Sequence, residues 1–433
     1  IRDWSSDVCS SDLREAQSPA APALVARARD IHERVLTLDT HVDIWTENFT
    51  PDRNYTRDLP TQVTLPKMAA GGLDAAFFIV YVGQGPLTEA GYAQAYREAM
   101  SKFEAIHWMT EELAPATIGL ATSAEEVRRI AASGRKVALI GVENGYPVGR
   151  DLDRIGEFAR RGARYMSLTH NGHSQFADSN TGEIRAGGMR YGGLSELGRR
   201  AVRELNRWGV MIDLSHPSKA ATLQMIELSA APVIASHSAA RALNDVPRNM
   251  DDEQLRALAE NGGVIQTVAF RSYVDKAKHS AFQIEYDRRL RELGEERGME
   301  VLADRRQLFM MAPAARRAYL ARIRPLEAEL DRQLGEFAAP PVDLADFVDH
   351  IDYLVDLIGI DHVGIASDFD GGGGVTGWDD AAETFNVTLE LVRRGYTEQE
   401  IAKLWGGNLL RVMEAVRRVG ERIRERDRAA AQP

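Results

Sequence analysis

The chain has 433 residues, of which 44% are hydrophobic and 27% charged, and its formal net charge is -11. This length allows a large buried core, and an acidic chain with dispersed lysines and arginines is a poor partner for nucleic acids or anionic membranes. No apolar run approaches the roughly 20 residues that cross a bilayer, so no membrane-spanning segment is expected.

The amino-terminal segment is expected to be foreign to the protein. Residues 1–13 back-translate to a nucleotide string that resembles a sequencing-library adapter, and they contain Cys9, the single cysteine, which excludes an intrachain disulfide. We therefore expect residues 1–13 to be non-native and residues 14–25 to form a flexible segment. The native N-terminus is then expected to be missing from the sequence, so an exported and a cytoplasmic location both stay open.

From Arg27 onward, short apolar runs alternate with helical patterns, which predicts parallel strands joined by crossover helices. The expected strands are 35–38, 73–82, 137–142, 165–168, 210–214, 233–235, 263–270 and 362–366. Helical spacing predicts helices over 124–132, 196–208, 219–228 and 251–260, with Ser123, Ser195 and Ser218 as N-caps. Eight such units predict an α/β fold, a (β/α)₈ TIM barrel over residues 26–419.

Two segments break this alternation. Residues 275–341 are dense in Arg, Glu, Leu and Ala with helical spacing, which predicts a helical insertion between strands 7 and 8. A lid, an oligomer contact and a solvated excursion without a function are all compatible with it. Residues 420–433 are charged and rich in alanine, and we expect a flexible tail there.

Reactive side chains follow most of the expected strands, at the end where such barrels carry their active sites. They are Asp39, His41, Asp43, Glu143, His170, His216, His237, Arg271, Tyr273, Asp368 and Asp370. The histidines on helical or charged segments, namely His32, His107, His279 and His350, are expected at the surface.

These residue types favour a metal centre. His41 and Asp43 alternate in an extended segment and so share a face, which lets both bind one ion. His216 and His237 follow adjacent strands and can hold a second ion, with Glu143 as a bridging carboxylate, although His216 alone is also compatible with a hydrogen-bonded core histidine. Imidazole and carboxylate without thiolate favour Zn²⁺, with Mn²⁺ or Co²⁺ as substitutes. Two ions roughly 3.5–4 Å apart would lower the pKa of a bridging water from about 15.7 toward about 7.

The sequence resembles the membrane dipeptidase (renal dipeptidase) family, zinc peptidases with an amidohydrolase-like barrel. The similar stretches are DTHVD at 39–43, YMSLTH at 165–170, GVMIDLSH at 209–216, APVIASHS at 231–238, PRN at 247–249, GIASDFDG at 364–371 and GNLLRV at 407–412. The likeness runs from about Val35 to Val416 and is interrupted by the insertion. This sequence lacks the cysteines and the carboxyl-terminal anchor signal of the mammalian members, so a disulfide-linked, lipid-anchored form is not expected.

The resemblance implies specific roles for nine residues. It implies that His41, Asp43 and Glu143 bind one zinc, and that Glu143, His216 and His237 bind the other. It also implies that His170, Arg248 and Tyr273 contact the substrate, that Asp368 transfers protons, and that the chain forms a homodimer. Arg248 has a competing interpretation as the partner of a loop carboxylate such as Asp245, Asp251 or Asp252.

Together these features predict a zinc-dependent dipeptidase. A metal-bridging hydroxide would attack the peptide carbonyl, His170 would stabilise the oxyanion, and Asp368 would pass the proton to the leaving amine. Arg248 would bind the substrate carboxylate as a planar fork. Another binuclear-metal amidohydrolase (a lactonase, phosphotriesterase or deaminase) and a non-catalytic metal- or peptide-binding barrel stay open. The first commonly uses a modified lysine or a single metal, whereas here Glu143 ends the third strand and Lys136 begins it.

Overall fold

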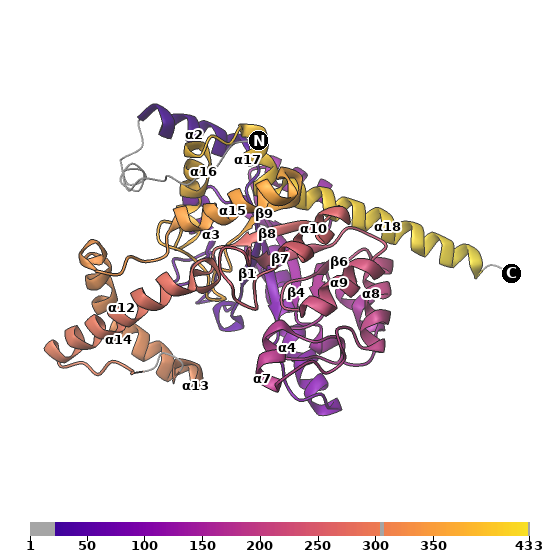
Figure 1. Ribbon diagram of the computed structural model, residues 1–433, viewed down its shortest axis with the longest axis horizontal. Helices are drawn as coiled ribbons and strands as arrows, with labels where there is room; N and C mark the ends of the chain where they lie inside the picture. Colours follow the sequence, from indigo (N-terminus) through magenta and orange to yellow (C-terminus); the bar gives the residue numbers. More distant parts are fainter. Residues whose placement is uncertain (1–21, 304–306, 432–433) are drawn as a thin grey trace.

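The computed structural model describes residues 22–303 and 307–431 and has a nearly closed barrel of parallel strands at its centre (Figure 1). The strands are β1 (Leu38–Asp43), β2 (Ala75–Tyr81), β3 (Ile118–Leu120), β4 (Lys136–Glu143), β5 (Ala163–Ser167), β6 (Met211–Asp213), β7 (Ile234–Ser238), β8 (Val264–Val268) and β9 (Val363–Ala366). Their order around the barrel is β1-β2-β4-β5-β6-β7-β8-β9. A parallel bridge between Val42 and Phe369 brings the two ends together, and the Asp43 amide donates to the Phe369 carbonyl over 2.9 Å. The predicted (β/α)₈ architecture is confirmed.

Strand β3 was not predicted from the sequence. It pairs in parallel with β4 but lies off the barrel path. Three residues are too short to show a periodicity of their own, which explains why the apolar pattern did not reveal it.

Helices connect and cover the strands. They are α2 (Pro22–Arg34), α3 (Leu65–Gly71), α4 (Glu89–His107), α5 (Ala124–Ala132), α6 (Asp153–Arg160), α7 (Asn180–Ala186), α8 (Glu196–Trp208), α9 (Lys219–Leu228), α10 (Asp252–Glu260), α11 (Arg271–Val274), α12 (Lys276–Glu296), α13 (Gln307–Met310), α14 (Pro313–Asp331), α15 (Leu344–Ile358), α16 (Thr384–Arg393), α17 (Glu398–Ala402) and α18 (Asn408–Ala430). Short 3₁₀ or π segments are η1 (Thr46–Asn48), η2 (Trp108–Leu113), η3 (Tyr146–Val148), η4 (Leu334–Glu336), η5 (Ile360–His362), η6 (Ala381–Glu383) and η7 (Lys403–Gly407). The predicted caps Ser123, Ser195 and Ser218 each accept a backbone amide of the first turn, as N-cap side chains do.

Two strands extend further into polar sequence than predicted. Strand β1 begins at Leu38 instead of Val35 and contains His41, and β7 continues through His237 to Ser238. Polar side chains are tolerated there because they are hydrogen bonded inside the barrel. For example, the Thr40 hydroxyl donates to the Ser236 carbonyl over 2.9 Å. The apolar pattern therefore located these strands but misplaced their ends.

One end of the barrel is covered by α18. Alternate strand residues such as Phe77 and Leu139 form one hydrophobic cluster with Leu409, Leu410 and Met413 of this helix. The Asn408 side chain donates to the Val363 carbonyl at the start of β9 over 2.8 Å, which places the helix at the amino-terminal ends of the strands. The opposite end is left to the loops that follow the strands.

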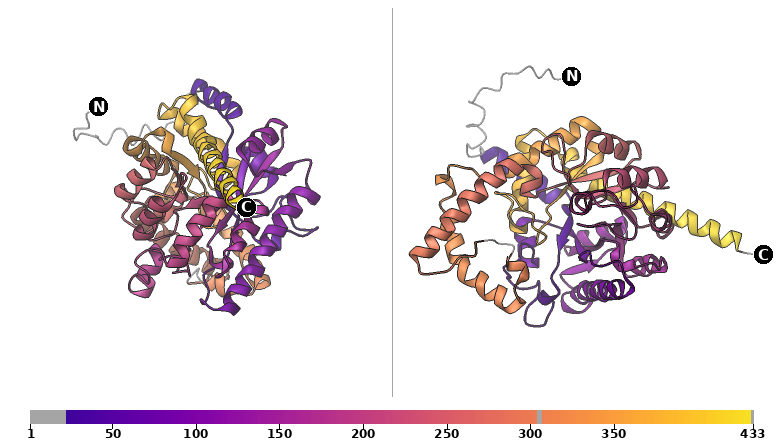
Figure 2. Two further views of the ribbon diagram at one scale, coloured as in Figure 1. Left: turned by 90° about the vertical axis from the view of Figure 1, so that its right-hand side faces the viewer. Right: turned by 60° about the horizontal axis from the view of Figure 1, so that its bottom comes forward.

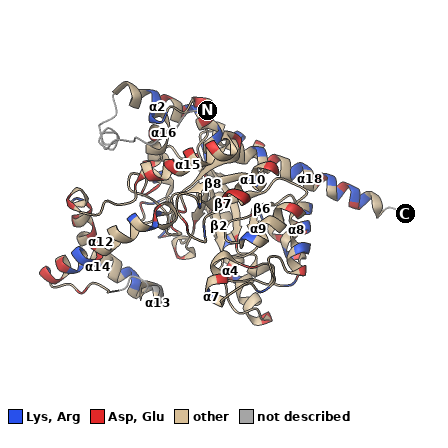
Figure 3. Ribbon diagram, in the orientation of Figure 1, with Lys and Arg blue, Asp and Glu red and all other residues tan. Residues whose placement is uncertain are grey.

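The predicted insertion is a separate helical arm. It contains α12, α13, α14 and η4, and it projects from the opposite side of the barrel to α18 (Figure 2). Its helices share a small hydrophobic core of their own, built from Leu290, Ile323, Leu326, Leu330 and Phe337 among others. Residues of both charge signs are distributed along the arm and along α18 (Figure 3).

Both ends of the described chain are helical where flexible segments were predicted. The expected non-native segment 1–13 lies outside the described residues, as do residues 14–21, whereas residues 22–25 already belong to α2. At the other end, α18 continues to Ala430 instead of ending in a tail at Gly420. An ion pair of 2.9 Å between Arg207 and Asp427 joins its last turns to α8. Among the helices of residues 22–303 and 307–431, none has the length and apolarity needed to span a bilayer.

Two histidines expected at the surface are buried. His32 lies 2.7 Å from the Thr388 hydroxyl and 2.8 Å from the Gly71 carbonyl, and His350 contacts the Ala240 amide and the Val274 carbonyl. Each ring has partners at both nitrogens, which makes its burial possible. These partners are distant in sequence, so the helical pattern alone could not reveal them.

Candidate metal centre

The histidines and carboxylates predicted to bind metal or move protons converge at the carboxyl ends of the strands. Donor atoms lie within 4.8 Å of one another in three overlapping groups: His41, Glu143 and His237; Glu143, His170 and His216; and His41, Asp43 and Asp368. They come from β1, β4 and β7 and from the turns after β5, β6 and β9. All seven residues are therefore part of one continuous cluster.

Glu143 lies at the centre of this cluster. Its Oε1 atom is 2.8 Å from Nε2 of His216 and 3.4 Å from Nε2 of His237. Its Oε2 atom is 3.6 Å from Nε2 of His41, which is also 3.6 Å from Oδ2 of Asp43. The two carboxylate oxygens thus face different sets of ligand-type residues, as a bridging carboxylate requires.

A hydrogen-bond chain orients His237. Its Nδ1 atom lies 2.7 Å from the Ser236 hydroxyl, and that hydroxyl donates to Oδ2 of Asp213 over 2.7 Å. Because the serine proton is directed to Asp213, the hydroxyl oxygen accepts from Nδ1–H of His237. The lone pair of Nε2 is then available toward Glu143 and His216, which is the tautomer that a metal ligand needs.

His41 is oriented by a second chain of the same kind. Its Nδ1 atom lies 2.8 Å from the Tyr165 hydroxyl, which donates to the Thr40 carbonyl over 3.0 Å. Nδ1–H of His41 therefore donates to the tyrosine oxygen, and Nε2 faces the carboxylates. This Nε2 atom is buried and has no hydrogen-bond partner.

The electrostatics of the cluster favour positive charge at its centre. Burial alone raises the pKa of Glu143, but the surrounding histidines, first His170 and His41, outweigh it and hold this pKa well below the usual range. Burial and the charge of nearby Arg248 hold the pKa of His216 well below its usual range, and burial does the same for His237, so these rings are neutral. At His41 burial is outweighed by Glu143 and Asp43, which raise its pKa well above normal. The ionised Glu143 and the neutral His216 and His237 are in the protonation states that bind divalent cations, whereas a cation bound at His41 would displace the proton that the two carboxylates hold there.

This donor set fits the metal that the sequence predicted. It contains imidazole nitrogens and carboxylate oxygens without a thiolate, a combination used for zinc and other borderline divalent ions. Nε2 of His41 is a buried polar atom without a protein hydrogen-bond partner, a costly arrangement unless a ligand satisfies it.

Asp368 lies beside the cluster in a strained conformation. Its φ angle of 58° is in the left-handed region, and its side chain is in one group with His41 and Asp43. Burial, with a further contribution from the charges of Asp43 and Glu143, raises the pKa of Asp368 to about 8 against the opposing effect of His41. A carboxyl group with this affinity for protons can take up and release one near neutral pH.

Arg248 and Tyr273 are the two remaining residues for which a substrate contact was predicted. The guanidinium is buried, donates to the Ser238 hydroxyl over 3.0 Å and to the His237 carbonyl over 2.9 Å, and lies 5.4 Å from the centre of the Tyr273 ring. Among the described residues no carboxylate is within ion-pair distance of it. The competing loop carboxylates have other partners, because Asp245 pairs with Arg241, Asp251 with Lys219, and Asp252 with Arg256.

Several supporting residues were not singled out from the sequence. Tyr165, Asp213 and Ser236 orient the two histidines, and His170 packs 4.6 Å from the ring of Tyr81. A signal for one of them was available: the Ser-His pair at 236–237 has a counterpart at 215–216. The others depend on contacts across strands, which sequence spacing does not show.

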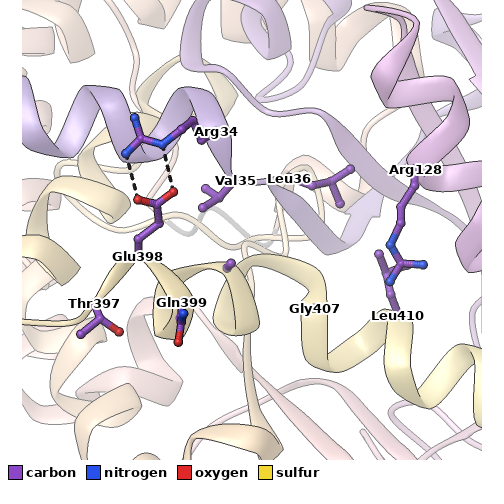
Figure 4. Close-up of a pocket in the computed structure, with 10 residues that line it drawn as sticks. Arg34, Val35, Leu36, Arg128, Thr397, Glu398, Gln399, Gly407 and Leu410 are labelled. Atoms are coloured by element: carbon purple, nitrogen blue, oxygen red, sulfur yellow. Dashed lines mark hydrogen bonds and ion pairs between the residues drawn. The ribbon is translucent and has the colours of Figure 1, made fainter.

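A separate cavity lies away from this cluster. A pocket of about 730 Å³ opens near the amino-terminal ends of the strands, between α2, α5 and α17 (Figure 4). There Arg34 and Glu398 pair through two hydrogen bonds of 2.9 Å, so the charged groups satisfy each other. None of the nine predicted site residues lines it, and this end of such barrels supports stability and not chemistry.

Comparison with known proteins gives consistent matches. The family model described as membrane dipeptidase (peptidase family M19) matches residues 25–427. The chain is 31% identical over 333 residues to dipeptidase verJ of Clonostachys rogersoniana, covering 77% of this chain and 68% of that protein. It is 29% identical over 403 residues to dipeptidase aclJ of Aspergillus oryzae, covering 90% and 80%. The crystal structure of the probable dipeptidase PvdM from Pseudomonas aeruginosa matches with 33% identity and a TM-score of 0.75, over 92% of this chain and 100% of that one.

Proposed function

The chain belongs to the membrane dipeptidase family of metallopeptidases, and from this premise we propose that it hydrolyses dipeptides with two zinc ions bridged by Glu143. In this proposal His41 and Asp43 complete one site, and His216 and His237 complete the other. The observation that carries it is the position of Glu143, whose two oxygens face His41 on one side and His216 on the other. When bound, two zinc ions would supply a water of pKa near about 7 and a Lewis acid for the peptide carbonyl.

Arg248 sets the length of the substrate in this proposal. A buried guanidinium with no carboxylate partner among the described residues is suited to an anionic ligand, and its fork binds a carboxylate in two parallel hydrogen bonds. The backbone amide between the two residues of a dipeptide then has a fixed distance from the bound carboxyl terminus. Tyr273 supports this grip by presenting its ring face to the guanidinium.

His170 and Asp368 perform the remaining steps. Nε2 of His170 lies 3.6 Å from Oε1 of Glu143, and burial lowers the pKa of His170, so the neutral ring can donate a hydrogen bond from one nitrogen to a developing oxyanion. Asp368 accepts the proton of the attacking water and delivers it to the amine that leaves. His170 shares a donor group with Glu143, and Asp368 shares one with His41 and Asp43, so both residues lie beside the cluster.

The alternative reactions are less well supported by the site. A barrel that bridges its metals through a modified lysine needs that lysine in the centre, whereas Lys136 lies at the start of β4 and pairs with Asp74 at 3.4 Å. A non-catalytic binding barrel gives no reason for a buried carboxyl of raised pKa beside the ligands. The homodimer implied by the family resemblance is part of the proposal and can be measured by sedimentation.

The test combines metal content with a matched pair of substrates. We expect purified protein to hold about two zinc ions per chain, to lose activity on chelation and to regain it with zinc. It should cleave an unblocked dipeptide such as Ala-Ala and act poorly on the same dipeptide with a carboxyl-terminal amide. Full activity after complete metal removal would refute the zinc proposal, and equal cleavage of both substrates would refute the carboxylate grip.

A further inference from the structure

The helical insertion contacts the mouth of the barrel at a pocket rich in arginine. Helix α14 and the loop that follows β1 enclose a cavity of about 490 Å³. Its charged lining consists of Arg53, Arg316, Arg317, Arg324, Glu47 and Asp370, four cations and two carboxylates. We refer to this cavity as the arginine pocket.

This excess of positive charge stands out because the protein as a whole is acidic. The chain has a net charge of -11, so arginines placed together without matching carboxylates are not explained by general solubility. One of the two carboxylates is also occupied, since Asp370 accepts the backbone amides of Gln62 and Val63 over 2.9 and 3.3 Å. Glu47 is then the carboxylate of the pocket that pairs with its guanidinium groups.

The guanidinium groups are held in place, but some of their N–H donors are left without an acceptor among the described residues. Arg316 and Arg317 share Glu47, with distances of 3.7 and 3.6 Å, and Arg316 lies 5.4 Å from the ring centre of Trp45. Arg53 is fixed by a 2.6 Å hydrogen bond from its Nε atom to the side chain of Asn48. Each guanidinium has five N–H donors in a planar fork, so donors remain for an anion that enters the pocket.

The arginine pocket adjoins the candidate metal centre. Trp45 follows the ligand-type residue Asp43 by two positions, and Asp370 follows Asp368 by two positions. Arg248, in contrast, follows β7, which is separated from β1 by β8 and β9 in the barrel order. A dipeptide whose carboxyl terminus is held by Arg248 and whose peptide bond lies at the cluster therefore extends its amino-terminal residue toward the arginine pocket.

We propose that the arginine pocket binds a carboxylate on the side chain of the amino-terminal residue of the substrate. The inference rests on the proposed dipeptidase function and names its substrate class, which is dipeptides that begin with an acidic residue. The insertion then has a defined role: α14 supplies Arg316 and Arg317 as a wall of the substrate site.

The experiment compares two dipeptides of nearly the same shape, Glu-Ala and Gln-Ala. We expect wild type to have a kcat/KM for Glu-Ala on the order of 10-fold higher than for Gln-Ala, the effect of one hydrogen bond to a charged group. In Arg316→Gln and Arg317→Gln this ratio should fall toward one. Arg322→Gln is the matched control, because Arg322 lies on the same helix but outside the pocket, where it donates to the Glu300 carbonyl over 3.3 Å. This control should keep the wild-type ratio.

Each outcome separates the two proposals. Cleavage of both dipeptides by wild type at equal rates would overturn the arginine pocket as a specificity site while leaving the dipeptidase function intact. Cleavage of neither dipeptide, nor of Ala-Ala, would refute the function and this inference together. If the arginine variants lower both rates equally and keep the ratio, the arginines only attach the insertion to the barrel, and the inference is wrong.

Discussion

Ser236 offers a direct test of how the barrel orients His237, a proposed metal ligand. Its hydroxyl accepts from Nδ1 of His237 and donates to Asp213, both over 2.7 Å. Replacing Ser236 with alanine removes the acceptor and leaves Nδ1–H of His237 buried without a partner. We expect weaker metal binding because the ring loses both its orientation and its preference for the tautomer that exposes Nε2.

The size of the effect follows from these contacts. Loss of a hydrogen-bond partner behind a metal-binding histidine typically costs about 10- to 100-fold in metal affinity, or about 1.4 to 2.8 kcal/mol. A buried donor left unsatisfied also lowers folding stability by about 1 to 3 kcal/mol. Asp213→Asn changes the hydrogen-bond chain one residue further from the His237 ring. It should therefore also weaken metal binding, but by a smaller factor.

The assay is competition with a chelator of known affinity at pH 7, with zinc content and melting temperature measured on the same samples. Ser229→Ala is the control, since it also removes a serine hydrogen bond, to the Ala231 carbonyl, but lies outside the cluster. It should change stability without changing zinc affinity. If folded Ser236→Ala binds zinc as tightly as wild type, Ser236 does not orient His237, and the tautomer argument fails.

Three further predictions concern the centre and the core. Arg248→Ala should lower kcat/KM for dipeptides by about 30- to several-thousand-fold, the cost of losing a charged partner, while the low activity on dipeptide amides should change much less. Glu143→Gln should reduce zinc content at both sites, whereas His41→Ala should mainly affect one, which elemental analysis of the two variants distinguishes. Burial lowers the pKa of His32 and His350, so their contribution to stability is complete above the unfolded pKa of about 6.5 and is lost as pH falls. The free energy of unfolding in urea should therefore decrease below this pH by up to about 1.4 kcal/mol per unit for each histidine, and His350→Gln should reduce that slope.

The sequence predicted the cluster well because barrel topology converts chain order into spatial position. Once a run is recognised as a barrel strand, the residue after it must lie at the common end, whatever its distance in sequence. Glu143 and His216 are 73 positions apart, and yet their side chains lie 2.8 Å from each other. The prediction needed only the strand ends, and small errors at β1 and β7 did not alter it.

Contacts between elements far apart in the sequence could not be predicted in this way. Glu47 and Arg316 are joined only because the insertion folds back over the loop after β1, and no periodicity reports such a contact. The same holds for His32 and Thr388, which pair across most of the chain length. Helical spacing shows which face of a helix is apolar, but it does not show which polar residue on that face will find a partner.

Backbone strain is concentrated at the same strand ends as the candidate metal centre. Among the described residues, the non-glycine positions with positive φ are Asn144, His216, Asp368 and Asp370, and each follows a barrel strand. Such conformations cost on the order of 1 to 3 kcal/mol each and persist where the surrounding structure fixes them. Asparagine, aspartate and histidine adopt them more readily than other residues, which makes the observed residue types reasonable. At His216 stability and the proposed metal binding are therefore opposed, because glycine would relax the turn and would at the same time remove the imidazole that lies 2.8 Å from Glu143.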